Sequence, residues 1–509
     1  MPEYKSPGVY IEEVDRGTKP IEAVGTSMTA FIGTTAEASI KQIDPETGER
    51  VPIESVLNKP TLVTSWTQFV TIFGDFYPGA YLPDAVYGYF ANGGGACYVV
   101  SLRALREGEG EAKAASVTIP TSGRGNSFKV TAKVPGPSDL NVTIKAGEED
   151  TFSMSVGGET KGGLTMKKGE DNFIGNAKFS AVEVSDVGSA SATPTEGVYA
   201  LEGGGVPPLT AEDFIGDVSE RSGIAGLEAI DEIRLLVAPD AMAGYDGSDA
   251  AKERVKMIQE AMIAHCESMK YRFAILDAPP GLGAQQAQEW RQYLNFDTSF
   301  AALYYPWIRV ADLSGAGSTS KLIPPSGHLA GIYNRTDTER GVHKAPANEV
   351  VRGAIDLELR LSKQEQDTLN PIGVNCIRTF PGRGIRVWGG RTLSSDGSWR
   401  YINVRRLFIM AEASLDVGLQ WVVFEPNDRM LWARVRRDVT SFLRTVWLSG
   451  ALFGSTPDEA FYVKCDDELN PPEIRDLGQL IIEVGMAPVK PAEFVIFRIS
   501  QWAGPSAEA

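Results

Sequence analysis

Three apolar runs of strand length alternate with two stretches in which apolar residues recur at helical spacing. The runs are 233–237, 273–276 and 301–305, and the helical stretches are 248–269 and 284–294. This strand–helix order predicts a parallel sheet with helical crossovers. Further apolar runs at 30–32 and 97–100 indicate that residues 20–103 complete the same α/β domain.

Residues 104–204 follow a different pattern. No Trp and no Tyr occurs between Tyr98 and Tyr199. Short alternating stretches such as 127–131 and 141–145 are separated by Gly, Pro and Asp or Asn. Several short strands with turn signals about every 10 residues predict a small β-sandwich or barrel. We expect it to be inserted at a surface site of the α/β domain.

The region from 350 to the end contains six of the nine Trp residues. Ser362 and Glu365 form a capping box that predicts a short helix, and longer helices are expected at 403–415 and 428–448. In the last of these, five apolar residues recur at heptad-like spacing and predict a core-facing side: Trp432, Val435, Val439, Phe442 and Val446. Arg434, Arg437 and Arg444 fall on a different stripe, roughly opposite.

Both ends of the chain carry a strand pattern with few local partners. The residues concerned are Val9, Tyr10, Ile11, Glu12 and Val14 near the start, and Phe494, Val495, Ile496, Phe497 and Ile499 near the end. Such strands either pair inside their own domain or add to the sheet of another subunit.

The composition is that of an ordinary globular protein. The 509 residues are 43% hydrophobic and 23% charged, which excludes a mostly disordered chain, a collagen and a coiled-coil rod. The net charge of −17 argues against general nucleic-acid binding, which requires a basic surface. The sequence contains no run of about 18 apolar residues, so no membrane span is predicted. The first residues also lack a signal-peptide pattern.

The residues that usually carry chemistry form no recognisable constellation. His265 lies on the apolar side of its helix and is expected to be a core histidine, whereas His328 and His343 fall in a stretch with a loop-like pattern. Asp240 and Asp277 each end a predicted strand, where they serve either a ligand or, more commonly, a helix cap or turn. Cys97, Cys266, Cys376 and Cys465 are expected to be buried thiols. We therefore predict no catalytic residue, no cofactor and no metal site.

Charge is unevenly distributed along the chain. Residues 377–445 contain twelve Arg, no Lys and six Asp or Glu, a local balance of +6 within an acidic chain. These arginines either pair within the molecule or form a basic face that meets an acidic partner.

Several blocks together resemble the contractile tail sheath proteins of phage tails, R-type pyocins and extracellular contractile injection systems. The most specific block runs from Ile323 to Glu349 and reads IPPSGHLAGIYNRTDTERGVHKAPANE, with His343 where an aromatic residue is common. YKSPGVYIEEV from Tyr4, GTSMTAFIG from Gly25, NPIGVNCIR from Asn370, VWGGRTL from Val387 and YINVRR from Tyr401 extend the resemblance. It covers nearly the whole chain except 104–204.

The resemblance implies a polymer of stacked hexameric rings around an inner tube, ending on baseplate and terminal cap proteins. It implies four parts: an N-terminal arm at 1–19, an α/β middle domain at 20–103 and 205–349, a β-rich insertion at 104–204, and an α+β inner sheath domain at 350–509. The terminal strands would be exchanged between subunits. Arg434, Arg437 and Arg444 would either face the tube or pair with acidic residues of the neighbouring sheath subunit. Assembly in the bacterial cytoplasm and release by lysis are expected, with no direct contact to nucleic acid and no membrane insertion.

Two other classes stay open from the residues alone. An α/β enzyme would use the sheet at 231–305, but it needs a polar constellation at the strand ends. A different structural part of a tail, such as a tube or baseplate protein, is the other alternative.

Overall fold

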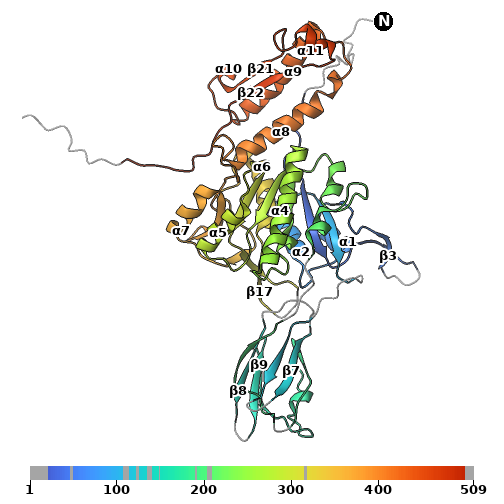
Figure 1. Cartoon of the computed structure of the whole chain (residues 1–509), viewed down its shortest axis with the longest axis vertical. Helices are drawn as coiled ribbons and strands as arrows, with labels where there is room; N and C mark the ends of the chain where they lie inside the picture. The colour runs from blue at the N-terminus through green and yellow to red at the C-terminus, as the bar shows by residue number, and fades with distance from the viewer. Residues whose placement is uncertain are drawn as a thin grey trace, which may run out of the picture. The chain divides into compact units, whose positions relative to one another are not determined.

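The computed structural model describes residues 21–45, 50–106, 114–121, 125–133, 140–147, 150–189, 192–202, 209–314 and 318–498. The chain divides into two compact units (Figure 1). The first, here called the central unit, is Gly25–Arg406; the second, the terminal unit, is Met1–Val24 with Leu407–Ala509. The division falls within helix α8 (Ile402–Gly418) and therefore later than the expected boundary between 349 and 350.

An eight-stranded sheet forms the core of the central unit, in the order β20-β19-β15-β14-β13-β1-β5-β4. Six strands are parallel: β1 (Thr29–Thr35), β5 (Cys97–Ala104), β13 (Leu235–Val237), β14 (Phe273–Asp277), β15 (Ala301–Tyr305) and β19 (Val374–Phe380). Antiparallel strands β4 (Thr61–Val63) and β20 (Gly384–Val387) close the two edges. The predicted parallel sheet is thus confirmed, and β19 and β20 explain why residues after 350 belong to this unit.

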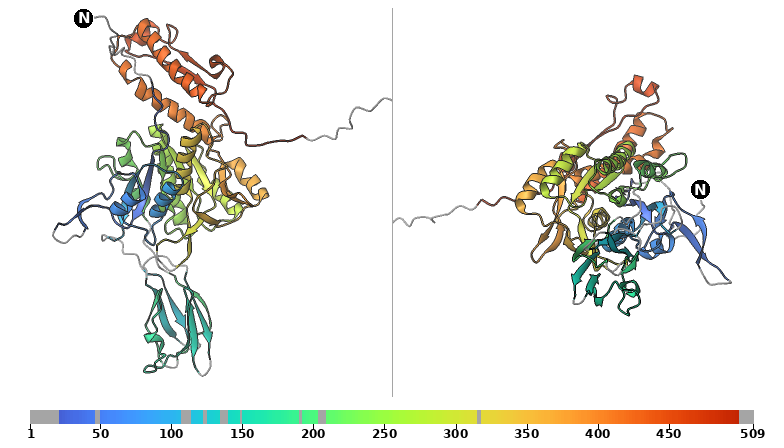
Figure 2. Two further views of the ribbon diagram at one scale, coloured as in Figure 1. Left: turned by 180° about the vertical axis from the view of Figure 1, so that it is seen from behind. Right: turned by 60° about the horizontal axis from the view of Figure 1, so that its bottom comes forward.

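Both faces of the sheet are covered by helices, which is why its strands are continuous apolar runs rather than alternating ones (Figures 1 and 2). Helix α4 (Asp249–Met269) packs on β14, with the predicted apolar residues Val255, Ile258 and Met262 in the core. Helices α2 (Leu82–Ala91) and α6 (Ser326–Arg340) pack on one another and on β1, β13 and β14. The central unit also contains α1 (Trp66–Phe73), α3 (Ala211–Ile215), α5 (Ala284–Leu294), α7 (Lys363–Leu369), β2 (Ser39–Ile43), β3 (Arg50–Ser55), β16 (Ile308–Ala311), β17 (Ser320–Ile323) and β18 (Ala354–Leu357).

The block that contains His328 is helical, which corrects its interpretation as loop-like. Helix α6 begins directly after Pro324 and Pro325, and a proline ring at a helix start supplies the required φ without losing a helical hydrogen bond. Close packing on α2 depends on glycine. A Cβ on Gly327 would lie 2.3 Å from the Cα of Ala85, and one on Gly88 would lie 2.2 Å from the His328 ring.

The described residues between 114 and 202 form two small antiparallel sheets with a hydrophobic core of their own. One sheet has the order β10-β9-β8-β12 and the other β11-β7-β6. Their bounds are β6 (Ser116–Pro120), β7 (Asn126–Ala132), β8 (Asn141–Ala146), β9 (Phe152–Val156), β10 (Glu159–Leu164), β11 (Val182–Ser185) and β12 (Gly197–Ala200). Phe128 and Phe152, one from each sheet, stack with ring centroids 5.9 Å apart. The strands predicted from the alternating pattern are therefore confirmed, and their apolar side chains point into this core.

The terminal unit is built around helix α9 (Arg429–Leu448), which packs on a two-stranded sheet. This sheet pairs β21 (Phe461–Lys464) with β22 (Glu483–Met486). The short helix α10 (Pro457–Ala460) precedes β21, and α11 (Pro472–Asp476) lies between the two strands in sequence. The five apolar residues predicted to face a core on α9 are all buried. Asp428 caps the helix by accepting a hydrogen bond from the Leu431 amide at 2.8 Å.

A buried ion pair joins α6 to the start of α8 inside the central unit. The Arg406 guanidinium donates to both carboxylate oxygens of Asp337, at 2.9 and 2.6 Å, and to the Thr26 carbonyl at 2.9 Å. The Thr26 hydroxyl donates to Asp337, and the Tyr333 ring lies 4.8 Å from the guanidinium carbon. Both charged side chains are at most 5% exposed. Each therefore loses its hydration on folding, and the attraction between the two charges is the main interaction that offsets this loss.

Two buried aspartates hold the first turns of α2 and α6 at the carboxyl edge of the sheet. Asp240 accepts backbone hydrogen bonds from Thr34, Tyr81 and Leu82, at 2.8, 2.6 and 3.2 Å. Asp277 accepts from the Ser326 amide at 2.9 Å and from the Ser326 hydroxyl. Burial raises the pKa of each carboxyl to about 7, although these hydrogen bonds lower it.

We expect Asp337→Asn to lower the free energy of unfolding by about 3–5 kcal/mol, because it leaves the Arg406 charge buried without a counter-charge. The matched control is Asp356→Asn, which removes the more exposed pair with Arg360, where the expected loss is under about 1 kcal/mol. Urea unfolding of both variants measures the difference, and equal losses would contradict the role assigned to the buried pair.

The Asp277 carboxyl predicts a pH dependence of stability. Its folded-state pKa lies above the unfolded value of about 4, so its contribution is largest at low pH and is lost as the pH rises through about 7. Asp277→Asn keeps an acceptor for the Ser326 amide and removes the titration. We expect the stability of the natural chain relative to this variant to fall by about 2 kcal/mol between about pH 5 and about pH 8. A difference that does not change with pH would show that the carboxyl is not shifted.

Candidate assembly surfaces

The sheet edge where open α/β folds usually bind ligands is filled by the protein itself. Asp240 and Asp277 stand at this edge as predicted, and both bind helix starts through the hydrogen bonds described above. The interpretation of these aspartates as caps is therefore confirmed. Both are nearly fully buried, which leaves neither carboxylate available to a ligand.

Two of the three histidines, His265 and His328, lie in the core, and His343 is partly buried. His265 is buried and its Nε2 contacts Arg272, whose other terminal nitrogen donates to the Leu227 and Ile230 carbonyls. Burial lowers the pKa of His265 to about 4, with a further contribution from Arg272. His328 is also buried, and burial lowers its pKa to about 4. The expectation for His265 is confirmed. The described residues contain no group of His, Cys, Asp and Glu able to hold a metal ion.

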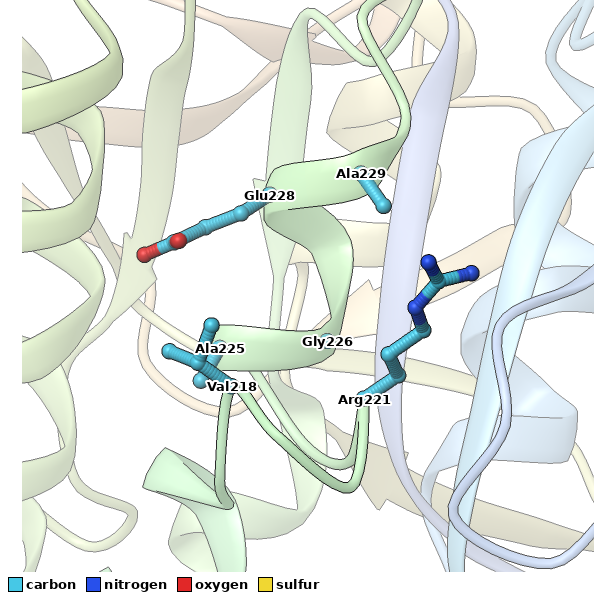
Figure 3. A pocket seen from close by; sticks show the side chains of 6 residues that line it. All are labelled: Val218, Arg221, Ala225, Gly226, Glu228 and Ala229. Carbon is cyan, nitrogen blue, oxygen red and sulfur yellow. The ribbon is translucent and has the colours of Figure 1, made fainter.

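A surface hollow of about 360 Å³ is lined by Val218, Arg221, Ala225, Gly226, Glu228 and Ala229. Figure 3 shows the Arg221 and Glu228 side chains pointing in different directions, away from one another. The lining contains no nucleophile and no pair of acid and base within reach of one another. This arrangement does not support general acid–base or nucleophilic chemistry.

The three arginines assigned to a tube contact do not share one environment. Arg437 and Arg444 are exposed on the side of α9 away from its core, and Arg437 pairs with Asp438 at 3.1 Å. Arg434 is half-buried, and its guanidinium carbon lies 5.3 Å from the centroid of the Trp421 ring. Only Arg437 and Arg444 are thus presented together on the surface.

Some of the arginines in the segment 377–445 are buried inside the central unit. Arg391, Arg405 and Arg406 are each at most 8% exposed, and Arg406 forms the ion pair with Asp337. The alternative of intramolecular pairing, left open by the sequence, therefore accounts for some of these arginines. One feature of the sequence could have indicated the ion pair between Arg406 and Asp337. The segments RTD at 335–337 and VRR at 404–406 both lie in the blocks that carry the family resemblance.

The segment with a strand pattern near the end of the chain is present but is not in a strand. Phe494, Val495, Ile496 and Phe497 are 70–83% exposed and extend beyond the last strand, β22. Ile499 and the N-terminal residues Val9, Tyr10, Ile11, Glu12 and Val14 lie outside the described residues. Four consecutive apolar side chains are therefore left in water, and contiguous exposed apolar surface of this kind is common at protein–protein interaction sites.

The two-stranded sheet of the terminal unit has unpaired outer edges among the described residues. Phe461 opposite Met486 and Val463 opposite Val484 form one side of it, and Tyr462 lies across from Gly485 on the other. Tyr462 is 54% exposed. An isolated two-stranded sheet is marginally stable, and its edges accept further strands.

No helix in the described part of the chain is both long and apolar enough to cross a membrane.

Profiles of known protein families match most of the chain after the insertion. The family profile described as the phage tail sheath protein central domain matches residues 218–393, and the phage tail sheath C-terminal domain matches 394–501. The boundary between the two profiles also lies after β20. It therefore agrees better with the division of the compact units than with a boundary at 349.

Full-length relatives and solved structures agree with the profiles. The tail sheath protein of Burkholderia phage BcepMu is 25% identical over 504 residues, which span 93% of this chain and 92% of the phage protein. The contracted helical sheath of the anti-feeding prophage superposes with a TM-score of 0.61 at 26% identity, covering 98% of this chain and 99% of that one. The contracted sheath of the extracellular contractile injection system PVC gives 0.59 at 25% identity, covering 99% of each chain. The chain thus belongs to the contractile tail sheath family and is a structural subunit of a contractile sheath.

Proposed function

We propose that this subunit polymerises as stacked hexameric rings around an inner tube, and that contraction of the polymer drives the tube through a target envelope. The observation that carries this proposal is the exposed apolar segment Phe494–Phe497 in a chain whose solved relatives include helical sheaths. A segment of this kind supports a heterologous contact between copies, and such contacts build helices when their rotation does not close.

The acceptor for this segment is the open sheet β21–β22 of a neighbouring copy. An added strand satisfies the backbone groups along a free edge and covers apolar side chains at the same time. The N-terminal residues Val9 to Val14 carry the same strand pattern and would add in the same manner. Each subunit is then tethered to its neighbours by strands that remain paired while the subunits move.

The stroke draws on packing between subunits and uses no nucleotide. The extended polymer is a metastable state held by a kinetic barrier, and a signal from the baseplate releases it. Each subunit moves as a nearly rigid body and contributes a few kcal/mol, about the scale of a small change in buried interface. The solved relatives include a baseplate of the anti-feeding prophage, which supports a baseplate as one partner here. A terminal cap, assembly in the bacterial cytoplasm and release by lysis complete the proposal.

Negative-stain electron microscopy of the chain produced alone, and then with its cognate tube protein, tests the proposal. We expect hollow, ridged tubes in at least the second sample. Soluble monomers in both samples would contradict it.

An Ile496→Pro substitution should abolish assembly and leave a folded monomer, because proline removes a donor from the added strand. Ile496→Val is the matched control, since it keeps both the donor and the β-branched side chain. Ile11→Pro should behave in the same way at the other end of the chain. Sedimentation and circular dichroism report assembly and folding, and a normal sheath from either proline variant would refute strand exchange.

Reversing the charge of Arg437 and Arg444 to Glu should permit empty sheaths but prevent ordered sheath around the tube. The reason is that these two arginines lie on the exposed side of α9, where an acidic tube surface can reach them. Arg429→Glu is the control, because it reverses the charge of another exposed arginine on the same helix, at its first residue and outside the 437/444 pair. Tube-filled particles at the natural yield from the double variant would count against a tube contact.

A further inference from the structure

The loop between α8 and α9 presents a phenylalanine with no cover. The Phe424 side chain is fully exposed, and its backbone φ of 69° lies in the left-handed region. For a residue other than glycine this conformation costs about 1 kcal/mol or more and persists only where the surrounding structure imposes it. Neither feature contributes to the core of the terminal unit.

The loop is held in place by side chains on either side of it. Asn427 donates from its amide nitrogen to the Gln479 carbonyl at 2.8 Å, and its amide oxygen accepts from the Trp432 indole at 2.7 Å. Asn470 in turn binds the backbone of Ile481 in both directions, at 2.7 and 3.0 Å. The loop and the segment at 477–481 therefore form one fixed surface.

Four exposed apolar residues, two on the loop and two on the segment that Asn427 joins to it, define what we call the Phe424 patch: Val423, Phe424, Leu477 and Ile481. Their exposed fractions range from 40% to full exposure. One member of the patch, Ile481, precedes the first residue of β22, Glu483, by two positions, so this end of the patch continues directly into the strand-accepting sheet. A rigid aromatic side chain surrounded by smaller apolar groups is typical of the residues that dominate a protein interface.

The segment Phe494–Phe497 needs two apolar counterparts, because it is apolar on both sides. In an extended strand, Phe494 and Ile496 point to one side and Val495 and Phe497 to the other. The sheet β21–β22 offers an apolar side towards α9, but its other side carries Lys464, Glu483 and the Tyr462 hydroxyl, which donates to Glu483 at 2.7 Å. One apolar row of an added strand would therefore remain in water if the sheet were its only contact.

We propose that the Phe424 patch of one copy binds the outward apolar row of the 494–497 segment of a second copy, beside the sheet that this segment extends. The inference rests on the proposed strand addition and adds the patch as a second half of the acceptor. A strand buried on both sides is held by side-chain packing as well as by its ladder of hydrogen bonds. The patch then fixes which strand is accepted, since a strand with one polar side gains nothing from it.

A photo-crosslinking experiment tests the contact directly. A benzophenone side chain replaces Phe424 in the full chain, which is mixed with isotopically labelled natural chain, assembled with its tube and irradiated. We expect mass spectrometry to find crosslinks from position 424 to residues 490–498 of a labelled copy. Crosslinks to the tube protein, to another part of a second copy or only within one chain would overturn the inference, while the assembled sheath itself would leave strand addition standing.

Assembly measurements provide a second test. Phe424→Ser should raise the protein concentration required for assembly about tenfold, the effect expected from truncating a central interface residue. The matched control is Val198→Ser, which changes another exposed apolar residue, 65% exposed, on the inserted sheets and should stay within about twofold. An unchanged threshold for Phe424→Ser would refute the patch, whereas failure of the natural chain to assemble with its tube would refute the proposed function instead.

Discussion

The ion pair between Arg406 and Asp337 fixes the centre of the subunit. Removing two charges from water is unfavourable by several kcal/mol each, and only a bidentate geometry with further hydrogen bonds offsets that loss. Here the Thr26 carbonyl and hydroxyl and the Tyr333 ring provide those additional contacts. Three distant parts of the chain meet at this point: the approach to β1, helix α6 and the first turn of α8. Because the terminal unit begins directly after Arg406, the place from which it departs is among the most firmly held positions of the central unit.

The same rigidity appears at the carboxyl edge of the sheet. In many proteins with parallel sheets this edge is open and binds a ligand. In this chain Asp240 and Asp277 hold the first turns of α2 and α6 there, and Gly88 and Gly327 allow those two helices to approach closely. A fold that often serves chemistry is thereby closed into a solid body. This packing supports the proposal that the subunits move as nearly rigid bodies.

Much of the fold could be predicted from the sequence, since local patterns determine it. Continuous apolar runs identified the buried parallel strands, and the spacing in 428–448 identified the buried side of α9. The predictions were wrong where contacts between distant parts of the chain determine the structure. The glycines in α6 make its sequence resemble a loop, although they serve its close contact with α2. Strands β19 and β20 pair with a sheet whose other strands are distant in sequence, which no local pattern indicates. The surfaces were harder still, because the exposure of Phe424 depends on a loop conformation that no periodicity reveals.

The inserted sheets have a further consequence for how such a subunit can diversify. The chain leaves the eight-stranded sheet after β5 and returns to its core at Leu209, which shares that core with Leu102 of β5, whereas the inserted sheets enclose a separate core. Its contents are therefore decoupled from the stability of the host sheet. Doubling the length of such an excursion costs only about 0.6 kcal/mol of closure entropy. We therefore expect this site to tolerate replacement of the inserted domain by a different one, because the core of the eight-stranded sheet contains none of its residues.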